Sequence, residues 1–264
     1  MSEALLAIAQ AYALAAAAMV LVMLLAWAWQ QRGGAAGIVD VVWTLGVGVI
    51  GVVFALMVAD GNINRRLILA GCIAGWSLRL GIHLLPRVFP GAPEDERYRK
   101  LHEGWGTAAR WRMLLFYQSQ ALAAPLFTLP MLIGGRSVEP FGVWDGLGVL
   151  IWAAALAGEW QADRQLAWFR PRQENRGQVC RMGWWRYSRH PNYFFEWLHW
   201  CSYVPLAVFA PLGWLALLPP AAMYYFLNFV TGIPPAEAQA LARRGDAYRE
   251  YQRTTSAFFP WPPG

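Results

Sequence analysis

The sequence predicts an all-α polytopic membrane protein, a helical bundle of about seven transmembrane helices with the N-terminus outside and the C-terminus inside. Hydrophobic residues make up 57% of the 264 residues, and charged residues make up only 14%. That charged share is about half of what soluble domains carry, so the composition argues against a water-soluble domain. Long apolar stretches, with basic residues clustered between them, also support this prediction.

Seven stretches meet, or nearly meet, the requirement of about 20 mainly apolar residues for a transmembrane helix. They are residues 4–29, 36–59, 66–89, 112–133, 142–162, 193–211 and 212–233. The first stretch lacks a basic start and is too long for a signal peptide, so we expect it to remain as the first membrane helix. A proline and a glycine in the sequence Ala210-Pro211-Leu212-Gly213 predict a tight turn, and hence a hairpin, between the last two.

The distribution of basic residues predicts the orientation. With the N-terminus outside, 18 of the 22 Lys and Arg residues fall in inward segments and 3 in outward segments, while Arg79 lies inside a helix. Positive charge gathers on the cytoplasmic side of membrane proteins, so the C-terminus is expected inside. The net charge of +6 is thereby explained as a topology signal, and no nucleic-acid partner is expected.

The organisation indicates one membrane domain over residues 1–264, with substrate-side helices in about 1–133 and a cofactor-binding region in about 142–264. The tail after Pro234 has the pattern of an amphipathic helix from Glu237 to Tyr251, expected to pack at the membrane surface. The three cysteines lack metal-ligand spacing and are odd in number. Neither a disulfide framework nor a metal site is predicted.

Ionisable residues at membrane depth form the first candidate site. Asp40 lies early in the second predicted helix and Arg79 in the middle of the third, where each costs insertion free energy of about 2.5–3.5 kcal/mol. They either pair with each other to fix helix packing or face a cavity. Trp76, Arg79 and His83 are spaced i, i+3 and i+7, so they share one helical face.

A second group follows the fifth predicted helix. Glu159, Asp163 and Arg170 fall on one stripe if that helix continues past the membrane surface. Such a stripe can bind ribose hydroxyls with its carboxylates and phosphate with its guanidinium, although a solvated face with ordinary ion pairs has the same pattern.

The third group begins with a predicted helix N-terminus at His190 and Pro191. Free N–H groups there and flanking arginines, among them Arg176 and Arg189, make an anion site. Anchoring to anionic lipid headgroups would require the same arginines. Asn192 is followed one turn later by a glutamate on the same face.

Two segments carry a resemblance to a known family. Their residues are Arg186-Tyr187-Ser188-Arg189-His190-Pro191-Asn192-Tyr193-x-x-Glu196 and Tyr248-Arg249-Glu250-Tyr251-Gln252-Arg253-Thr254-Thr255-Ser256-Ala257-Phe258-Phe259-Pro260. With Val39-Asp40-Val41-Val42-Trp43, they resemble bacterial membrane proteins related to the steroid 5α-reductases. The resemblance covers most of the chain and is densest over residues 143–262.

The resemblance implies a seven-helix enzyme that reduces an activated carbon–carbon double bond with hydride from NADPH. It implies cofactor contacts by the residues that match the family pattern. These are Asp163, Arg170, Tyr187, Asn192 and Glu196, with Glu159 where the family has asparagine.

The substrate half departs from the family pattern. Val39-Asp40 stands in place of a Gln-Glu pair, and Trp76 stands in place of the tyrosine that polarises the substrate carbonyl. Because tryptophan has no phenolic proton, we expect either another donor, such as His83 or Tyr117, or a substrate other than a 3-oxo steroid. Arg79, His83 or a protonated Asp40 could stabilise the negative charge that forms on the carbonyl oxygen.

These observations predict an NADPH-dependent reductase in a bacterial inner membrane, with membrane lipids around it and an apolar substrate that enters from the lipid. A membrane methyltransferase of the isoprenylcysteine carboxyl methyltransferase type, using S-adenosylmethionine, shares a similar Arg-His-Pro-x-Tyr segment. A transporter or lipid-binding scaffold is the third alternative. The arginine-rich cofactor region favours a ligand with several phosphates.

Overall fold

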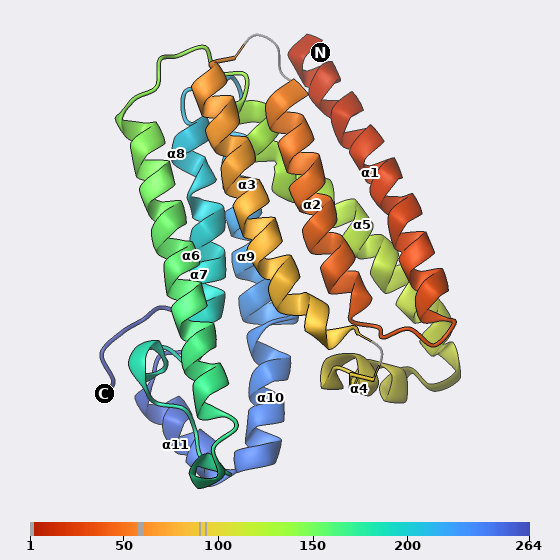
Figure 1. Ribbon diagram of the computed structural model, residues 1–264, viewed down its shortest axis with the longest axis vertical. Helices are drawn as coiled ribbons and strands as arrows, with labels where there is room; N and C mark the ends of the chain where they lie inside the picture. The colour runs from red at the N-terminus through yellow and green to blue at the C-terminus, as the bar shows by residue number, and fades with distance from the viewer. Residues whose placement is uncertain (1–2, 58–60, 90, 93) are drawn as a thin grey trace. The chain divides into compact units, whose positions relative to one another are not determined.

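The computed structural model describes residues 3–57, 61–89, 91–92 and 94–264. Helices are joined by loops throughout these ranges, which contain no β-strand, so the all-α prediction is confirmed (Figure 1). The chain divides into two compact units. The first unit comprises Met1–Gly142 and Leu206–Ala216, and the second comprises Val143–Pro205 and Leu217–Gly264.

Long helices form the frame of the first unit. They are α1 (Glu3–Gln30), α2 (Ile38–Met57), α3 (Ile63–Leu84) and α5 (Ala109–Gly134). Between α3 and α5 lie the 3-10 turn η1 (Leu85–Arg87), the short helix α4 (Glu96–Trp105) and the 3-10 turn η2 (Gly106–Ala108). Helix α2 packs against α1, α3 and α5 (Figure 1).

Four segments in the described part of the chain are long and apolar enough to cross a membrane. They are Leu5–Gln30, Ile38–Met57, Ile63–Arg87 and Gly213–Arg244. A span needs about 20 apolar residues, so these segments identify an integral membrane protein. The count of seven spans and the orientation of the termini stay predictions.

Small and aromatic residues hold α2 against α3. A Cβ atom on Gly48 would lie 2.1 Å from the hydroxyl of Ser77, which donates a hydrogen bond of 2.9 Å to the carbonyl of Thr44. The ring of Trp43 meets that of Trp76 edge-on, with centroids 6.1 Å apart. Close helix packing through small residues is typical of membrane bundles, where lipid supplies no hydrophobic drive between helices.

The second unit is more segmented. Its elements are α6 (Val143–Phe169), η3 (Gln173–Asn175), η4 (Gly183–Arg186), α7 (Pro191–Cys201), α9 (Leu218–Tyr225), the π-helical turn η6 (Phe226–Val230), α10 (Ile233–Arg244) and α11 (Asp246–Thr254). The short elements α8 (Tyr203–Ala207) and η5 (Gly213–Leu217) are divided between the two units.

Two sequence predictions of continuous helix are wrong in this part. The stretch 193–211 is broken into α7 and α8, consistent with Pro205, which cannot donate a backbone hydrogen bond. The stretch 212–233 lies almost wholly within the candidate span Gly213–Arg244, where η5, α9, η6 and α10 follow one another. The turn between them is confirmed, with Leu212 at a φ of 64°. The predicted tail helix is two helices, because Gly245 adopts a φ of 51° between α10 and α11.

Helix α6 packs closely on α7 through Gly158. A Cβ atom at this position would meet the ring of Phe195, so a larger residue would force that ring to shift. The buried face of α6 also includes Glu159 and Ala162. The helix runs to Phe169, beyond the apolar stretch that ends at residue 162, as the predicted polar stripe requires.

Candidate functional site

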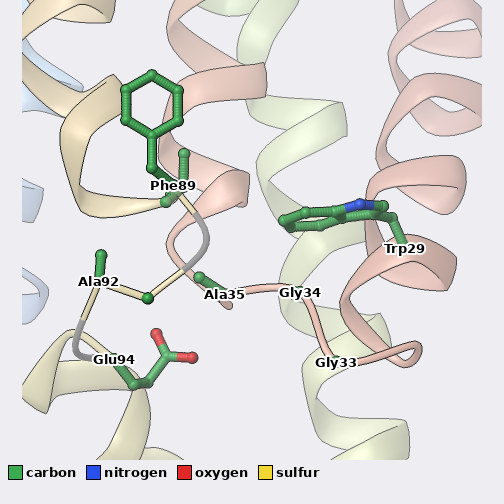
Figure 2. A pocket seen from close by; sticks show the side chains of 9 residues that line it. Trp29, Gly33, Gly34, Ala35, Phe89, Ala92 and Glu94 are labelled. Atoms are coloured by element: carbon green, nitrogen blue, oxygen red, sulfur yellow. The ribbon is translucent and has the colours of Figure 1, made fainter.

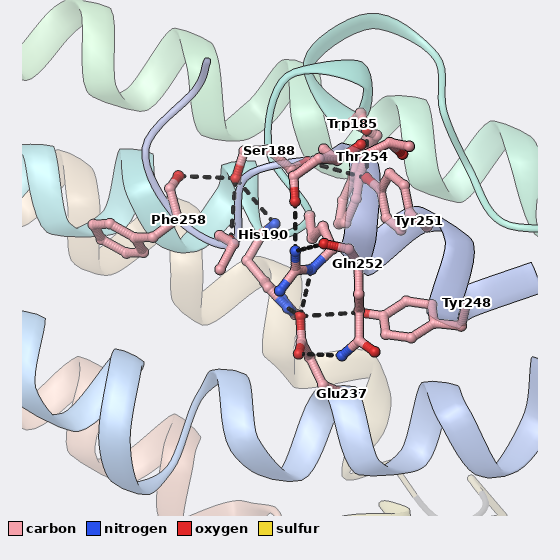
Figure 3. A network of polar contacts seen from close by, with 12 residues as sticks. Trp185, Ser188, His190, Glu237, Tyr248, Tyr251, Gln252, Thr254 and Phe258 are labelled. Carbon is pink, nitrogen blue, oxygen red and sulfur yellow. Dashed lines mark hydrogen bonds and ion pairs between the residues drawn. The ribbon is translucent and has the colours of Figure 1, made fainter. Parts of the chain in front are cut away.

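A polar network in the second unit surrounds the carboxylate of Glu237 on α10 (Figure 3). Its Oε1 accepts from Nε of Arg189 at 2.6 Å and from Nε2 of His190 at 3.3 Å, and its Oε2 accepts from Nε2 of Gln252 at 2.6 Å. The side chains of Arg189, His190 and Glu237 are 11%, 8% and 14% exposed. The network is therefore a nearly buried ion pair with neutral donors around it.

The C-terminal segment completes the network. The backbone N–H of Arg189 donates to the carbonyl of Ser256 at 2.8 Å, and its Nη1 donates to the carbonyl of Gln252 at 3.0 Å. The hydroxyl of Ser188 donates to the carbonyl of Phe258 at 2.8 Å. Two segments 60 to 70 residues apart in the sequence are thus fixed to each other.

Arg189 and His190 were predicted as cofactor ligands, and the structure places both side chains in contacts within the protein instead. His190 occupies the position before the first turn of α7, as the sequence predicts, and Pro191 is its first residue. The imidazole ring also stacks on Tyr193, with centroids 5.3 Å apart. Both residues hold the start of α7, so they position its other side chains.

Asn192 and Glu196 lie one turn apart on α7, as predicted. The carboxylate of Glu196 accepts a hydrogen bond of 2.9 Å from Nε1 of Trp200. The amide of Asn192 is half-buried and makes no hydrogen bond within the described part of the chain. A half-buried amide with unused hydrogen-bonding groups is suited to a polar ligand.

The remaining predicted cofactor residues differ in exposure. Glu159 is 5% exposed on α6, Asp163 is half-buried, and Arg170 follows the end of that helix and is exposed. Arg176 is exposed just after η3, and Tyr187 is 38% exposed after η4. Arg170, Arg176 and Tyr187 therefore lie at the surface of the protein, whereas Glu159 lies inside it.

A second cluster lies in the first unit, where α2 begins. The hydroxyl of Tyr98 on α4 donates to Oδ1 of Asp40 at 2.7 Å, and Nη2 of Arg97 contacts Oδ2 at 3.0 Å. Arg97 also pairs with Asp95 at 3.1 Å. Asp40 thus takes Arg97 as its partner, and the expected pairing with Arg79 is wrong for this carboxylate.

Burial and charge set the protonation state of this cluster. Burial raises the pKa of Tyr98 well above its usual value, and the charge of Asp40 raises it further. Burial alone would raise the pKa of Asp95, but hydrogen bonds and the charge of Arg97 lower it below its usual value. Tyr98 is 3% exposed, so the cluster holds a buried, protonated phenol next to a carboxylate.

A pocket of about 320 Å³ lies at the same end of the first unit (Figure 2). Oε2 of Glu94, which lines it, accepts a hydrogen bond of 2.9 Å from the N–H of Ala36, and the hydroxyl of Tyr117 donates to the carbonyl of Ala36 at 3.0 Å. The ring of Trp29 forms the opposite wall (Figure 2). Glu94, which precedes α4, and Tyr117 on α5 therefore fix the loop before α2.

The other predicted substrate residues are not drawn together. Tyr117 is fully buried and uses its hydroxyl in packing, whereas His83 is exposed and contacts Nη2 of Arg87 at 2.9 Å. Arg79 is half-buried on α3. The shared face of Trp76, Arg79 and His83 thus runs from a buried end to an exposed end.

An apolar groove of about 660 Å³ lies in the second unit. Its lining is formed by Trp197, Cys201, Val204, Pro205, Leu217, Pro220, Ala221 and Tyr224. The indole N–H of Trp197 is already bonded to the carbonyl of Pro220 at 3.1 Å. The groove therefore offers mainly apolar surface, and its volume lies in the range of small-molecule sites.

Comparison with known families gives one match. Residues 26–255 match a family described as "Protein of unknown function (DUF1295)". The chain belongs to this family. No match was found among curated proteins, and none among solved structures. Membership of DUF1295 thus covers most of the chain, including both polar clusters, without assigning an activity.

The sequence did not reveal three central residues of this DUF1295 protein. Glu237 was placed only in an amphipathic tail helix, and Tyr98 and Arg97 fell in a segment counted for its positive charge. The motif near the end of the chain was a usable signal for Glu237, because Gln252 of that motif and Glu237 both contact Arg189. For Tyr98 the local sequence carries no comparable signal, because its partner is 58 residues away.

His190 makes the stability of the protein depend on pH. Burial lowers the pKa of His190 from its usual 6.5, and the hydrogen bond to Glu237 offsets only part of that shift. The unfolded chain therefore binds a proton more readily than the folded protein. This contribution to stability is fully present above pH 6.5 and is lost as the pH falls below it, so we expect the thermal unfolding midpoint in detergent to decrease with acidification.

The measurement is a series of thermal unfolding curves from about pH 7.5 to 5.5. His190→Gln keeps a donor for Glu237 and removes the titration, so its midpoint should fall less over this range. His102→Gln, in the first unit, should keep the wild-type slope. An unchanged slope in His190→Gln would contradict the assignment.

Proposed function

We propose that this protein is an NADPH-dependent reductase of an activated carbon–carbon double bond in an apolar substrate that enters from the membrane. The observation that carries the proposal is the buried phenol of Tyr98, bonded to Asp40 at 2.7 Å, with Arg97 on the same carboxylate. This is the proton donor that the tryptophan at position 76 cannot supply. The resemblance to steroid 5α-reductase-like proteins supports the same reaction.

The chemistry requires a donor at the substrate carbonyl. Addition of hydride to the β-carbon of an enone moves negative charge onto the carbonyl oxygen, and a proton is then taken up at the α-carbon. The single O–H of Tyr98 donates to Asp40 in the protein without substrate. With substrate bound, this O–H would turn from Asp40 to the carbonyl oxygen and stabilise it by a hydrogen bond, while Arg97 would remain as the partner of the carboxylate. A tyrosine is already protonated at neutral pH, and burial raises the pKa of Tyr98 further above its usual value.

Residues of the second unit fit a phosphate-bearing nucleotide. Arg170 and Arg176 are both exposed, so both can reach phosphate groups of a ligand, and the amide of Asn192 has free hydrogen-bonding capacity. When bound, NADPH would supply the hydride. The side chain of Arg189 contacts Glu237 at 2.6 Å, so it would act by holding α7 in place.

The proposal includes the topology predicted from the sequence: seven spans, N-terminus outside, C-terminus inside, in a bacterial inner membrane. The 18 to 3 distribution of basic residues supports this orientation. The apolar groove of about 660 Å³ supports an apolar substrate.

Equilibrium binding of NADPH, NADH and S-adenosylmethionine to detergent-purified protein tests the proposal. We expect NADPH to bind most tightly. Asn192→Ala should lower the affinity for NADPH about tenfold, the effect of losing a hydrogen bond to a charged ligand. Glu196→Ala should lower the affinity for NADPH as well. Asn64→Ala, an exposed asparagine in the first unit, is the matched control and should bind like the wild type.

Other outcomes decide against the reductase. Binding of S-adenosylmethionine alone would identify the methyltransferase alternative. Binding of none of the three ligands would favour the transporter or scaffold.

A further inference from the structure

A row of alternating tryptophans and arginines follows one side of α6. Trp160, Arg164, Trp168 and Arg172 are spaced by four residues, so the three on the helix share one face. The guanidinium carbon of Arg164 lies 4.5 Å from the ring centroid of Trp160, and that of Arg172 lies 3.1 Å from the ring centroid of Trp168. These four residues are termed the Trp–Arg row.

The Trp–Arg row lies on the side of α6 opposite its packed face. Gly158 and Ala162 on the packed face are buried, whereas Trp160 and Trp168 are 49% and 52% exposed. An indole ring next to a guanidinium combines apolar surface with a positive charge. Such pairs suit the interface between membrane and water, where tryptophan is enriched.

Both guanidinium groups keep donors for an anion. Arg164 makes no ion pair or hydrogen bond within the described part of the chain, and Arg172 meets only the exposed Glu174, at 3.5 Å. A guanidinium held next to a ring keeps N–H groups that the ring does not occupy, and these can bind a phosphate through two hydrogen bonds. The row therefore combines phosphate-binding guanidinium groups with amphipathic indole rings.

The place of the row along α6 suits the membrane interface. The helix has 27 residues, hence a length of about 40 Å, compared with about 30 Å for the hydrocarbon core. In the proposed topology, a span that begins near Val143 leaves the hydrocarbon near Ala162, so Arg164 and Trp168 lie at headgroup depth on the cytoplasmic side. Tryptophan is enriched at that depth, and the leaflet there carries anionic lipid.

We propose that the Trp–Arg row is a binding surface for the headgroups of anionic phospholipids. Their phosphates bind the guanidinium groups of Arg164 and Arg172, while Trp160 contacts the upper acyl region and Trp168 contacts the headgroup region. The surface does not use Asp163 or Arg170, which are assigned to the cofactor.

Native mass spectrometry of the full-length protein in detergent, titrated with phosphatidylglycerol or phosphatidylcholine, tests this proposal. An interfacial arginine contributes about fivefold to the affinity for anionic lipid, so the double variant Arg164→Gln/Arg172→Gln should bind phosphatidylglycerol about 25-fold more weakly. Its affinity for phosphatidylcholine should stay unchanged. Arg32→Gln removes an exposed arginine that is not stacked on a ring, and should bind both lipids like the wild type.

Two further arms identify the ligand and the role of the rings. Soluble glycerol phosphate at the same concentration should not displace phosphatidylglycerol, and displacement would overturn the assignment to lipid. The double variant Trp160→Leu/Trp168→Leu keeps both charges and should also lower the affinity for phosphatidylglycerol. Unchanged affinity in the arginine double variant would overturn the proposal. Because micelle binding requires neither a membrane orientation nor NADPH, that failure would be distinct from a failure of the proposed topology or reductase activity.

Discussion

Replacing Glu237 with leucine is expected to lower the free energy of unfolding by about 3–5 kcal/mol, the cost of leaving a buried charge without its partner. The charge that remains is Arg189, 11% exposed and bonded to Glu237 at 2.6 Å. Two carbonyl groups would still accept from its Nη1, but neither carries a charge. His190 and Gln252 would lose an acceptor at the same time.

Chemical unfolding in detergent measures this difference. Glu237→Gln keeps the shape of the side chain and one acceptor oxygen, so its free energy of unfolding should lie between those of the wild type and the leucine variant. Glu250→Gln is the control, since its carboxylate pairs with Arg253 on the surface of α11 and its loss should leave the unfolding midpoint unchanged. Equal midpoints for Glu237→Leu and Glu250→Gln would show that the network does not stabilise the fold.

The network also shows what sequence reasoning reaches. The start of α7 was predicted from His190 and Pro191, because the cue is local: proline is favoured in the first turn of a helix. The role of Arg189 was not predicted, because an arginine before a helix N-terminus can contact either a ligand or a carboxylate from elsewhere in the chain. Only the fold brings Glu237, 48 residues further on, to it.

Helix boundaries follow the same division. The spans α1, α2 and α3 were predicted closely because their apolar character is continuous. The short helices between α7 and η6 were not predicted, because an apolar stretch has the same composition whether it forms one helix or several. Prolines such as Pro219 and Pro220 then decide where hydrogen bonding stops and starts, and a π-helical turn at Phe226–Val230 has no cue in composition.

Tyr98→Phe is expected to reduce kcat for NADPH-dependent reduction by about 10²–10³-fold, the effect of removing one donor to a developing oxyanion. The substitution removes a single hydroxyl and keeps the ring, which packs against Phe116 with centroids 6.2 Å apart. Affinity for NADPH should be unchanged, because the predicted cofactor residues lie in the second unit. The assay follows NADPH oxidation in single turnovers with the best substrate of an apolar enone panel.

Two variants separate chemistry from packing. Tyr12→Phe removes another phenol of the first unit, one that donates to the carbonyl of Leu122 at 3.0 Å, and should retain the wild-type kcat. Asp40→Asn keeps the size of the side chain but removes its charge, so it should lower kcat while leaving NADPH affinity intact. Wild-type turnover in Tyr98→Phe would remove the phenol from the mechanism. The donor at the carbonyl oxygen would then have to be sought at His83 or Arg79, because the hydroxyl of Tyr117 is committed to the carbonyl of Ala36.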